Sequence, residues 1–308
     1  MNIEADGLEL SPSLSIGIPA GRDISWTQRI LSRLESPATQ VEVLVARWSK
    51  TPLTDEDLQR LNKYFPTKEV QSQARHAPAM RNAIVREAQT THLLFLDDDM
   101  VPEPDLLYHA LQLAGREPNI VHQGIPYLVA NSHNWLARTE GKVYQKSFSR
   151  YLTADNQVSL LDARLMLVPV DVLLKTPFNE SMAAGGGEGH ELARCLIEQG
   201  IPLRLGTELL GGHTNRETLM GLIAQKRAHG RGRGYMLLNE GPGEKGWIEY
   251  IKTYIGRHLL EPAKDWRKGE LNTEELMYVW GTYSVHWLGV IEEIMQAKMS
   301  FINSIFFR

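Results

Sequence analysis

Short apolar runs alternate with amphipathic segments along the first third of the chain. Residues 14–18 (LSIGI), 41–46 (VEVLVA) and 93–96 (LLFL) are almost wholly apolar, which is typical of strands buried on both faces of a parallel sheet. Residues 25–35 and 54–65 lie between these runs and carry apolar side chains at helical spacing. Strands that alternate with helices predict an α/β fold with a mostly parallel sheet and right-handed crossovers.

Further elements follow the same reasoning. Thr54 and the acidic residues after it predict a capped helix start, and residues 79–89 predict a helix that leads into the apolar run at 93–96. In the middle of the chain we expect strands at 120–130, 164–170 and 201–205 and helices at 171–175, 190–199 (ended by Gly200) and 214–229.

The composition changes after the glycine-rich stretch 230–234 and the turn at 240–246. We therefore predict two parts, an α/β domain over residues 1–239 and a C-terminal helical appendix over residues 240–308. The appendix is rich in aromatic residues: Trp247, Tyr250, Tyr254, Trp266, Tyr278, Trp280, Tyr283, Trp287 and the terminal SFINSIFFR. Packing against the main domain is the ordinary role of such residues, and the alternatives are peripheral membrane contact or a homo-oligomer interface.

Composition excludes several classes of protein. The 308 residues are 43% hydrophobic with a formal net charge of −4, so no basic field favours duplex nucleic acid as a partner. The one cysteine, Cys195, excludes an internal disulfide framework and indicates a reducing compartment, so we expect a cytoplasmic protein. The N-terminal MNIEADGLELSPS is not a secretory signal, and no run of 18 apolar residues predicts a spanning helix.

Three consecutive carboxylates are the strongest chemical signal in the sequence. Asp97, Asp98 and Asp99 directly follow the apolar run at 93–96, and nearby prolines prevent the strand from continuing. Open α/β sheets bind ligands at the carboxyl ends of their strands, and carboxylates this close together are costly unless a cation holds them. Mg²⁺ or Mn²⁺ suits such oxygen ligands. The alternative is an acidic solvated turn.

Two later segments carry further candidate chemistry. Glu188 lies in a glycine-rich loop that opens a helix, and Glu191 follows in its first turn. Glycines allow close approach to a ligand, and the helix start offers donors to anions. The alternative is a helix start with favourable acidic residues. His213 follows a predicted strand in GGHTNRETL.

Taken together and in this order, these segments resemble the GT-A fold nucleotide-sugar glycosyltransferases of family 2. LSIGIPAGRD resembles the first strand and nucleotide loop of the family, and HLLFLDDDMVPEPDLL, preceded by Arg81-Asn82-Ala83, resembles its DXD stretch. GGGEGHELARCLIEQG resembles its acceptor-side segment, and HTNRETL followed by HGRGRG resembles its later histidine and basic helix. The resemblance spans roughly residues 14–234.

The resemblance implies roles at the donor site. Asp97 and Asp98 are expected to face the ribose and sugar, and Asp99, with His213 and Asp97, to hold Mn²⁺ or Mg²⁺. The alternative for His213 is contact with the donor diphosphate. The other donor-binding residues implied are Pro19, Ala20 and Arg22 beside the nucleotide, Arg81 near the donor, and Arg227, Arg231 and Arg233 as phosphate clamps. A solvated basic helix end is the alternative for those three arginines.

The resemblance implies a catalytic carboxylate as well, and here the chain departs from the family. The family's Glu-Asp pair is Glu188-Gly189 in this sequence, so either Glu188 or Glu191 takes the role of base, or no base acts at this position. The second strand ends in Ala46-Arg47-Trp48-Ser49 without the acid that recognises uracil in many members. The donor base is therefore open; Trp48 is expected to stack on a base or simply to pack.

The function that this resemblance implies is a metal-dependent hexosyltransferase that uses a nucleoside-diphosphate sugar, with UDP-sugars favoured. The acceptor stays open among saccharide, lipid-linked sugar, peptide and small metabolite. Three rival interpretations are a non-catalytic member that binds a nucleotide sugar or a partner protein, a sugar-phosphate nucleotidyltransferase, for which PAGRD is a poor first-loop match, and a glycosyltransferase that modifies nucleic acid.

Overall fold

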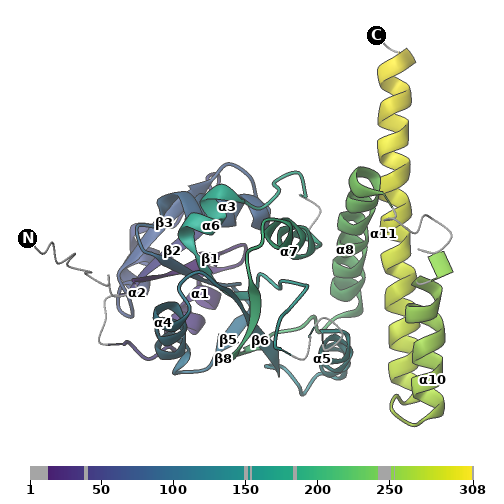
Figure 1. Cartoon of the computed structure of the whole chain (residues 1–308), viewed down its shortest axis with the longest axis horizontal. Coiled ribbons are helices and arrows are strands. Elements are labelled where there is room, and N and C mark those ends of the chain that lie inside the picture. The colour runs from purple at the N-terminus through teal and green to yellow at the C-terminus, as the bar shows by residue number, and fades with distance from the viewer. Residues whose placement is uncertain are drawn as a thin grey trace, which may run out of the picture.

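The computed structural model describes residues 13–37, 41–148, 152, 155–182, 186–241, 251–252 and 254–306. Figure 1 shows a sheet flanked by helices on both faces, with α8 and α11 side by side along one side of this body. The acidic N-terminus, Trp247, Tyr250 and the side chains of the terminal SFINSIFFR lie outside the described part of the chain.

Eight strands form one sheet in the order β3-β2-β1-β4-β7-β6-β8-β5. They are β1 (Leu14–Pro19), β2 (Val41–Trp48), β3 (Thr67–Ser72), β4 (His92–Leu96), β5 (Met100–Pro102), β6 (Val121–Val129), β7 (Leu165–Pro169) and β8 (Leu203–His213). Pairing is parallel among β3, β2, β1 and β4 and between β6 and β8, and antiparallel where β7 meets β4 and β6 and where β5 meets β8. The predicted mostly parallel α/β sheet is therefore confirmed.

Helices connect and cover these strands. They are α1 (Ile24–Leu31), α2 (Asp55–Leu61), α3 (Ala77–Glu87), α4 (Leu106–Arg116), α5 (Trp135–Phe148), α6 (Val170–Lys175), α7 (Glu188–Glu198), α8 (Leu219–Glu240), the π-helix η2 (Gly256–Leu260), α10 (Glu261–Arg267) and α11 (Thr273–Phe306). The predicted Thr54 cap is confirmed, because its hydroxyl and the Asp57 side chain form a reciprocal capping box. The predicted C-terminal helices are also present.

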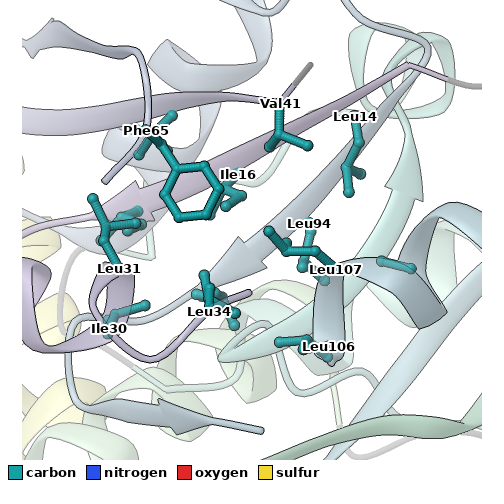
Figure 2. Packing of buried hydrophobic residues seen from close by; sticks show 14 of the residues in the cluster. Leu14, Ile16, Ile30, Leu31, Leu34, Val41, Phe65, Leu94, Leu106 and Leu107 are labelled. Carbon is teal, nitrogen blue, oxygen red and sulfur yellow. The ribbon is translucent and has the colours of Figure 1, made fainter. Parts of the chain in front are cut away.

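The core has two halves, one on each face of the sheet, because side chains along a strand alternate between faces. Leu94 and Leu96 of β4 pack with β1 and β2 against α1 and α4, as Figure 2 shows for the labelled members of this cluster. Leu93 and Phe95 face the other way, into a second cluster that includes residues of α3, α6 and α7. Strand β4 is thus buried on both faces, as its apolar sequence predicts.

Several predicted boundaries are wrong. The helix expected at 214–229 begins only at Leu219 and continues through the glycine-rich stretch to Glu240. The strand expected at 201–205 begins at Leu203 and extends to His213, and β3, β5, α4 and α5 are not among the predicted elements. Among the described residues, no helix is long and apolar enough to cross a membrane.

The glycines of α8 are needed for its packing on α11. A Cβ added at Gly230 would lie 2.0 Å from the carbonyl oxygen of His286, and one at Gly289 would lie 2.2 Å from that of Arg227. The two helix backbones therefore approach more closely than any side chain allows. Ion pairs flank this contact, from Arg227 Nε to Glu292 (2.7 Å) and from Arg231 Nε to Glu293 (3.0 Å).

Candidate active site

The aspartates follow β4 at the carboxyl end of the central parallel strands. Two neighbouring segments fix the last of the three: β5 pairs Met100 with His213 of β8, and the Thr214 amide donates to the Asp99 carbonyl at 2.9 Å. Asp98 and Asp99 are each only 8% exposed. The sheet topology therefore brings His213, more than 100 positions later in the sequence, against Asp99.

The pairing of Asp99 with His213 defines the candidate metal centre. Asp99 Oδ1 lies 3.2 Å from His213 Nε2. Asn215 Nδ2 donates to the Ala137 carbonyl at 2.8 Å. The other amide atom, Asn215 Oδ1, therefore faces His213 Nδ1 at 2.6 Å and accepts a hydrogen bond from it. Nε2 of His213 therefore faces the Asp99 carboxylate, and the two side chains present a nitrogen and an oxygen side by side to a cation.

These two side chains fit a divalent ion such as Mn²⁺. An imidazole nitrogen and a carboxylate oxygen about 3 Å apart suit two neighbouring positions around one ion with bonds of about 2.1 Å. Among the described residues, no group of three histidine, cysteine or acidic side chains completes a larger ligand set. Most of the coordination positions would therefore fall to a ligand such as a diphosphate.

Asp97, the third predicted metal ligand, faces a different partner. Arg81 is 1% exposed and donates from Nη2 to Asp97 Oδ1 at 2.6 Å and from Nη1 to Glu188 Oε1 at 3.3 Å. Burial raises the pKa of Asp97, Arg81 opposes this shift, and the neighbouring Asp99 adds to it. Arg81 thus connects the first aspartate of the run to the glutamate at the start of α7.

Arg22 closes the other side of the aspartates. Its amide donates to Asp98 Oδ2 at 2.8 Å and its Nη2 to Asp99 Oδ2 at 2.7 Å, while its guanidinium stacks on Trp26. Burial raises the pKa of the Asp98 carboxyl. Burial would also raise the pKa of Asp99, but His213 and Arg22 outweigh it and hold that pKa below its ordinary value.

Arg47 holds the first loop, which is predicted to border the nucleotide. Arg47 belongs to the end of the second strand, where the acid found in many family members is missing. Arg47 Nη1 donates to the carbonyls of Ala20 (2.9 Å) and Arg22 (2.5 Å), and the Ala20 amide donates to the carbonyl of Ala46. Arg47 therefore shapes the loop that follows Pro19. Trp48 packs against the core cluster below α3, with Lys50 over its ring.

The two candidate bases are placed differently. Glu188 opens α7 after Gly186 and Gly187, which both have positive φ (87° and 98°), and its Oε2 is buried without a hydrogen-bond partner among the described residues. Glu191 instead accepts a hydrogen bond from Asn179 at 2.8 Å. Packing explains why a glycine stands at position 189, where the family has an aspartate, because a Cβ there would lie 2.0 Å from the Leu161 carbonyl oxygen.

One cavity of about 890 Å³ collects part of the predicted set. Asp97, Asp99, Arg81, Glu188 and His213 line it. The predicted residues that do not line it are Pro19, Ala20, Arg22, Asp98, Glu191, Arg227, Arg231 and Arg233. The first four lie around the other side of the aspartates, and Arg227 and Arg231 form the ion pairs with α11.

Sequence reasoning missed several residues of this cavity. Arg164 and Asp162 form a buried ion pair in which Asp162 also accepts from Tyr144, and the Arg164 carbonyl accepts from the Asp97 amide. Arg216, three residues after His213, lines the cavity as well. The position of Arg216 in HTNRETL was a usable signal, whereas Tyr144, Asp162 and Arg164 lie in segments without a recognisable motif.

Comparison with known proteins agrees with this geometry. A mannosyltransferase from Pyrobaculum calidifontis, solved with GDP-Man and Mn²⁺, matches with a TM-score of 0.55 and 14% identity over 97% of this chain and 89% of that one. Glucosyl-3-phosphoglycerate synthase from Mycobacterium tuberculosis, solved with Mn²⁺, UDP and glucosyl-3-phosphoglycerate, matches with a TM-score of 0.50 and 14% identity over 73% and 79%. At this identity the likeness shows the fold alone.

The sequence itself has a clear family match. No curated protein matches it in a sequence search. The family described as "Glycosyltransferase like family 2" matches residues 20–232, more than half of the chain, and this range contains the aspartate run, Glu188 and His213. The chain therefore belongs to the Glycosyltransferase like family 2 and is a glycosyltransferase of the GT-A fold.

Proposed function

We propose that the protein transfers a sugar from a nucleoside-diphosphate donor, with UDP-sugars favoured, to an acceptor hydroxyl in a metal-dependent reaction. The observation that carries this proposal is the Asp99–His213 pair, which lines the same cavity as Glu188. Asp99 and His213 would hold Mn²⁺ or Mg²⁺, which when bound neutralises charge on the diphosphate. The expected cytoplasmic location stays a prediction.

Side chains around the aspartates would bind and orient the donor. Pro19 ends β1, and Ala20 and Arg22 lie in the following loop that Arg47 holds; all three would border the nucleotide. Arg216 lines the cavity next to His213 and has no ion-pair partner among the described residues. We assign to it the diphosphate contact that the sequence suggested for the arginines of α8.

Glu188 would serve as the general base. Arg81 holds its Oε1 and fixes the carboxylate, while Oε2 has no hydrogen-bond partner among the described residues. As the acceptor oxygen bonds to the anomeric carbon, the bond from that carbon to the diphosphate breaks, and Glu188 Oε2 takes the hydroxyl proton. Glu191 is engaged with Asn179 outside the cavity lining.

The donor site is tested first by thermal shift with UDP, GDP, dTDP, CDP and their common sugars, each with Mn²⁺, Mg²⁺ or EDTA. A ligand at 100 times its Kd stabilises the folded protein by about 2.7 kcal/mol. We expect a metal-dependent shift with one nucleotide that is lost in Asp99→Asn, which keeps side-chain volume but removes the carboxylate.

Asp105→Asn is the matched control, because Asp105 is exposed at the start of α4 and makes no capping hydrogen bond. It should leave the shift unchanged. A metal-independent shift, or one that survives in Asp99→Asn, contradicts the assigned metal centre. A folded protein that responds to no nucleotide favours a non-catalytic member of the family.

A further inference from the structure

On the side away from the aspartates, the cavity is lined by residues of α5, α8 and α11, which form its far wall. No role in donor binding has been assigned to these lining residues. The residues that line the cavity run from Asp99 and His213 to α5, α8 and α11. Figure 1 shows α8 and α11 side by side, and α11 lies outside the matched family region, residues 20–232. The polar or aromatic side chains on this wall include Glu140 and Tyr144 from α5, Gln225 and Lys226 from α8, and Tyr278 and Tyr283 from α11.

Helix α5 is fixed next to the candidate metal centre. Asn215, which accepts from His213 Nδ1, donates to the carbonyl of Ala137 in α5. Gly141 lets the helix sit directly on β6, because a Cβ there would lie 2.1 Å from Val129 Cγ2. Glu140, which lines the cavity, directly precedes Gly141 and lies almost one turn after Ala137, so the backbone that carries it is fixed on both sides.

Several buried oxygen atoms on this wall have no hydrogen-bond partner in the part of the chain that the structure describes. Lys226 Nζ donates to Glu140 Oε1 at 2.7 Å, but Glu140 Oε2, Gln225 Oε1 and the Tyr278 hydroxyl have no hydrogen-bond partner among the described residues. Glu140 and Tyr278 are 8% and 7% exposed. Burying such groups unpaired is costly, so the site favours a ligand that donates hydrogen bonds at several points.

Three of the cations that line the cavity already form ion pairs with carboxylates. Lys226 is paired with Glu140, Arg164 with Asp162, and Arg81 with Asp97 and Glu188. Arg216, next to His213, is the remaining lining cation and is assigned to the donor. A phosphate or carboxylate on the acceptor would therefore meet neutralised cations and the unpaired oxygens of Glu140 and Glu188, which repel it.

We propose that α5, α8 and α11 form the acceptor subsite and that the acceptor is a neutral polyhydroxy compound, a saccharide or cyclitol. Its hydroxyls donate to Glu140 and Gln225 and pair with Tyr278. Glu140, Gln225 and Tyr278 are positioning residues that present one hydroxyl to Glu188. This inference rests on the proposed glycosyl transfer.

The test measures release of nucleoside diphosphate from the donor identified above, with each acceptor probe added. Neutral probes are glucose, mannose, galactose, N-acetylglucosamine, trehalose and myo-inositol; octyl glucoside represents a lipid-borne headgroup; glucose 6-phosphate and 3-phosphoglycerate are the anionic probes. We expect at least one neutral probe to accelerate release tenfold or more and to yield a glycosylated product, while neither anionic probe does. Activity with octyl glucoside alone indicates a lipid-borne source of the same headgroup.

Two conservative variants test the wall itself. Glu140→Gln and Tyr278→Phe should each raise the KM for the neutral acceptor about tenfold, a larger fold-change than in the donor KM. Glu274→Gln and Tyr108→Phe, at exposed positions outside the cavity, are the matched controls.

The outcomes separate the two proposals. If the unmodified protein neither binds nor hydrolyses any donor, the proposed function itself is wrong. If donor is hydrolysed but no neutral probe accelerates release, or an anionic probe does so better, the acceptor class is wrong. If both variants keep the acceptor KM, the wall does not position the acceptor.

Discussion

Arg81 sets the geometry of the site at the scale of single residues. Its guanidinium is almost completely buried and holds one oxygen of Asp97 and one of Glu188. A buried cation between two carboxylates compensates their desolvation and leaves neither free to rotate. The donor-side aspartate and the proposed base are therefore kept at one separation by a single side chain from α3.

The two candidate bases can be distinguished by matched substitutions. Glu188→Gln keeps the shape of the side chain and removes its basicity, so kcat with the acceptor should fall by ~10²–10⁴-fold while the Kd for the donor changes little. Glu191→Gln should lower kcat by no more than a few-fold, because Glu191 holds Asn179 and does not line the cavity. Steady-state kinetics and donor titration measure both quantities. The opposite ranking of the two variants would transfer the base role to Glu191.

Sequence reasoning named candidate residues at this scale where a residue type was tied to a strand end, and the roles assigned to them stay predictions. Asp97 to Asp99 were found because three charges directly follow a buried strand, and His213 was found by its place in a resembling segment. Tyr278 and Glu140 could not be found, because their importance depends on how distant helices pack. The sequences around both residues are typical of ordinary amphipathic helices.

At the scale of elements, the glycine-rich stretch 230–234 shows why a local pattern misled. Glycine lowers helix propensity by about 1 kcal/mol per residue, so the sequence suggested that the helix ends at 229. In the structure α8 continues, because the glycines allow backbone contact with α11 that compensates for poor propensity. The strand β3 (TKEVQS) was missed because, at the sheet edge, it has too few apolar residues.

Glycine substitutions in the α8–α11 contact should separate packing from propensity. Gly289→Ala places a Cβ against the Arg227 carbonyl, so we expect the free energy of unfolding to fall by about 1–3 kcal/mol. Gly281→Ala in the same helix meets nothing within 4 Å and should raise it by up to ~1 kcal/mol. Urea denaturation measures both. Equal destabilisation by the two substitutions would mean that close backbone contact is not what the glycines provide.

At the scale of the whole molecule, the predicted division at residues 239 and 240 remains a prediction. Helix α8 belongs to the first part by sequence, yet it packs along α11 of the second. The two parts are also connected through Lys142 of α5, which pairs with Glu275 at 2.9 Å, and through Lys146 of the same helix, which pairs with Glu270. We therefore expect the C-terminal helices to unfold together with the main domain.

The stability of the whole fold should depend on pH through buried histidines. His122 is 1% exposed in β6, and burial lowers its pKa to about 4, although Glu117 opposes this shift. The folded protein keeps this imidazole neutral while the unfolded chain takes up a proton near pH 6.5. The free energy of unfolding should therefore fall as pH decreases from 6.5 to 4, by on the order of 3 kcal/mol from this residue.

Urea denaturation of the protein and of His122→Leu at several pH values between 7.5 and 4.5 measures this effect. In His122→Leu, the number of protons taken up on unfolding in this pH range should be smaller by up to one. The pH dependence that comes from other buried histidines should remain. His133→Gln, at a side chain that is 79% exposed, is the control. An unchanged pH slope in His122→Leu would show that His122 takes up its proton equally in both states.

The part of the cavity lining that α11 contributes lies outside the family region, and this has a consequence for how such enzymes diverge. Asp99, His213 and Glu188 belong to the region shared with the family, whereas Tyr278 and Tyr283 come from a helix beyond it. Mutations in α11 can change the shape and polarity of one wall while the residues proposed to activate the donor stay intact. A duplicated copy of this gene could therefore acquire a new product through a few substitutions in one helix, without passing through an inactive ancestor.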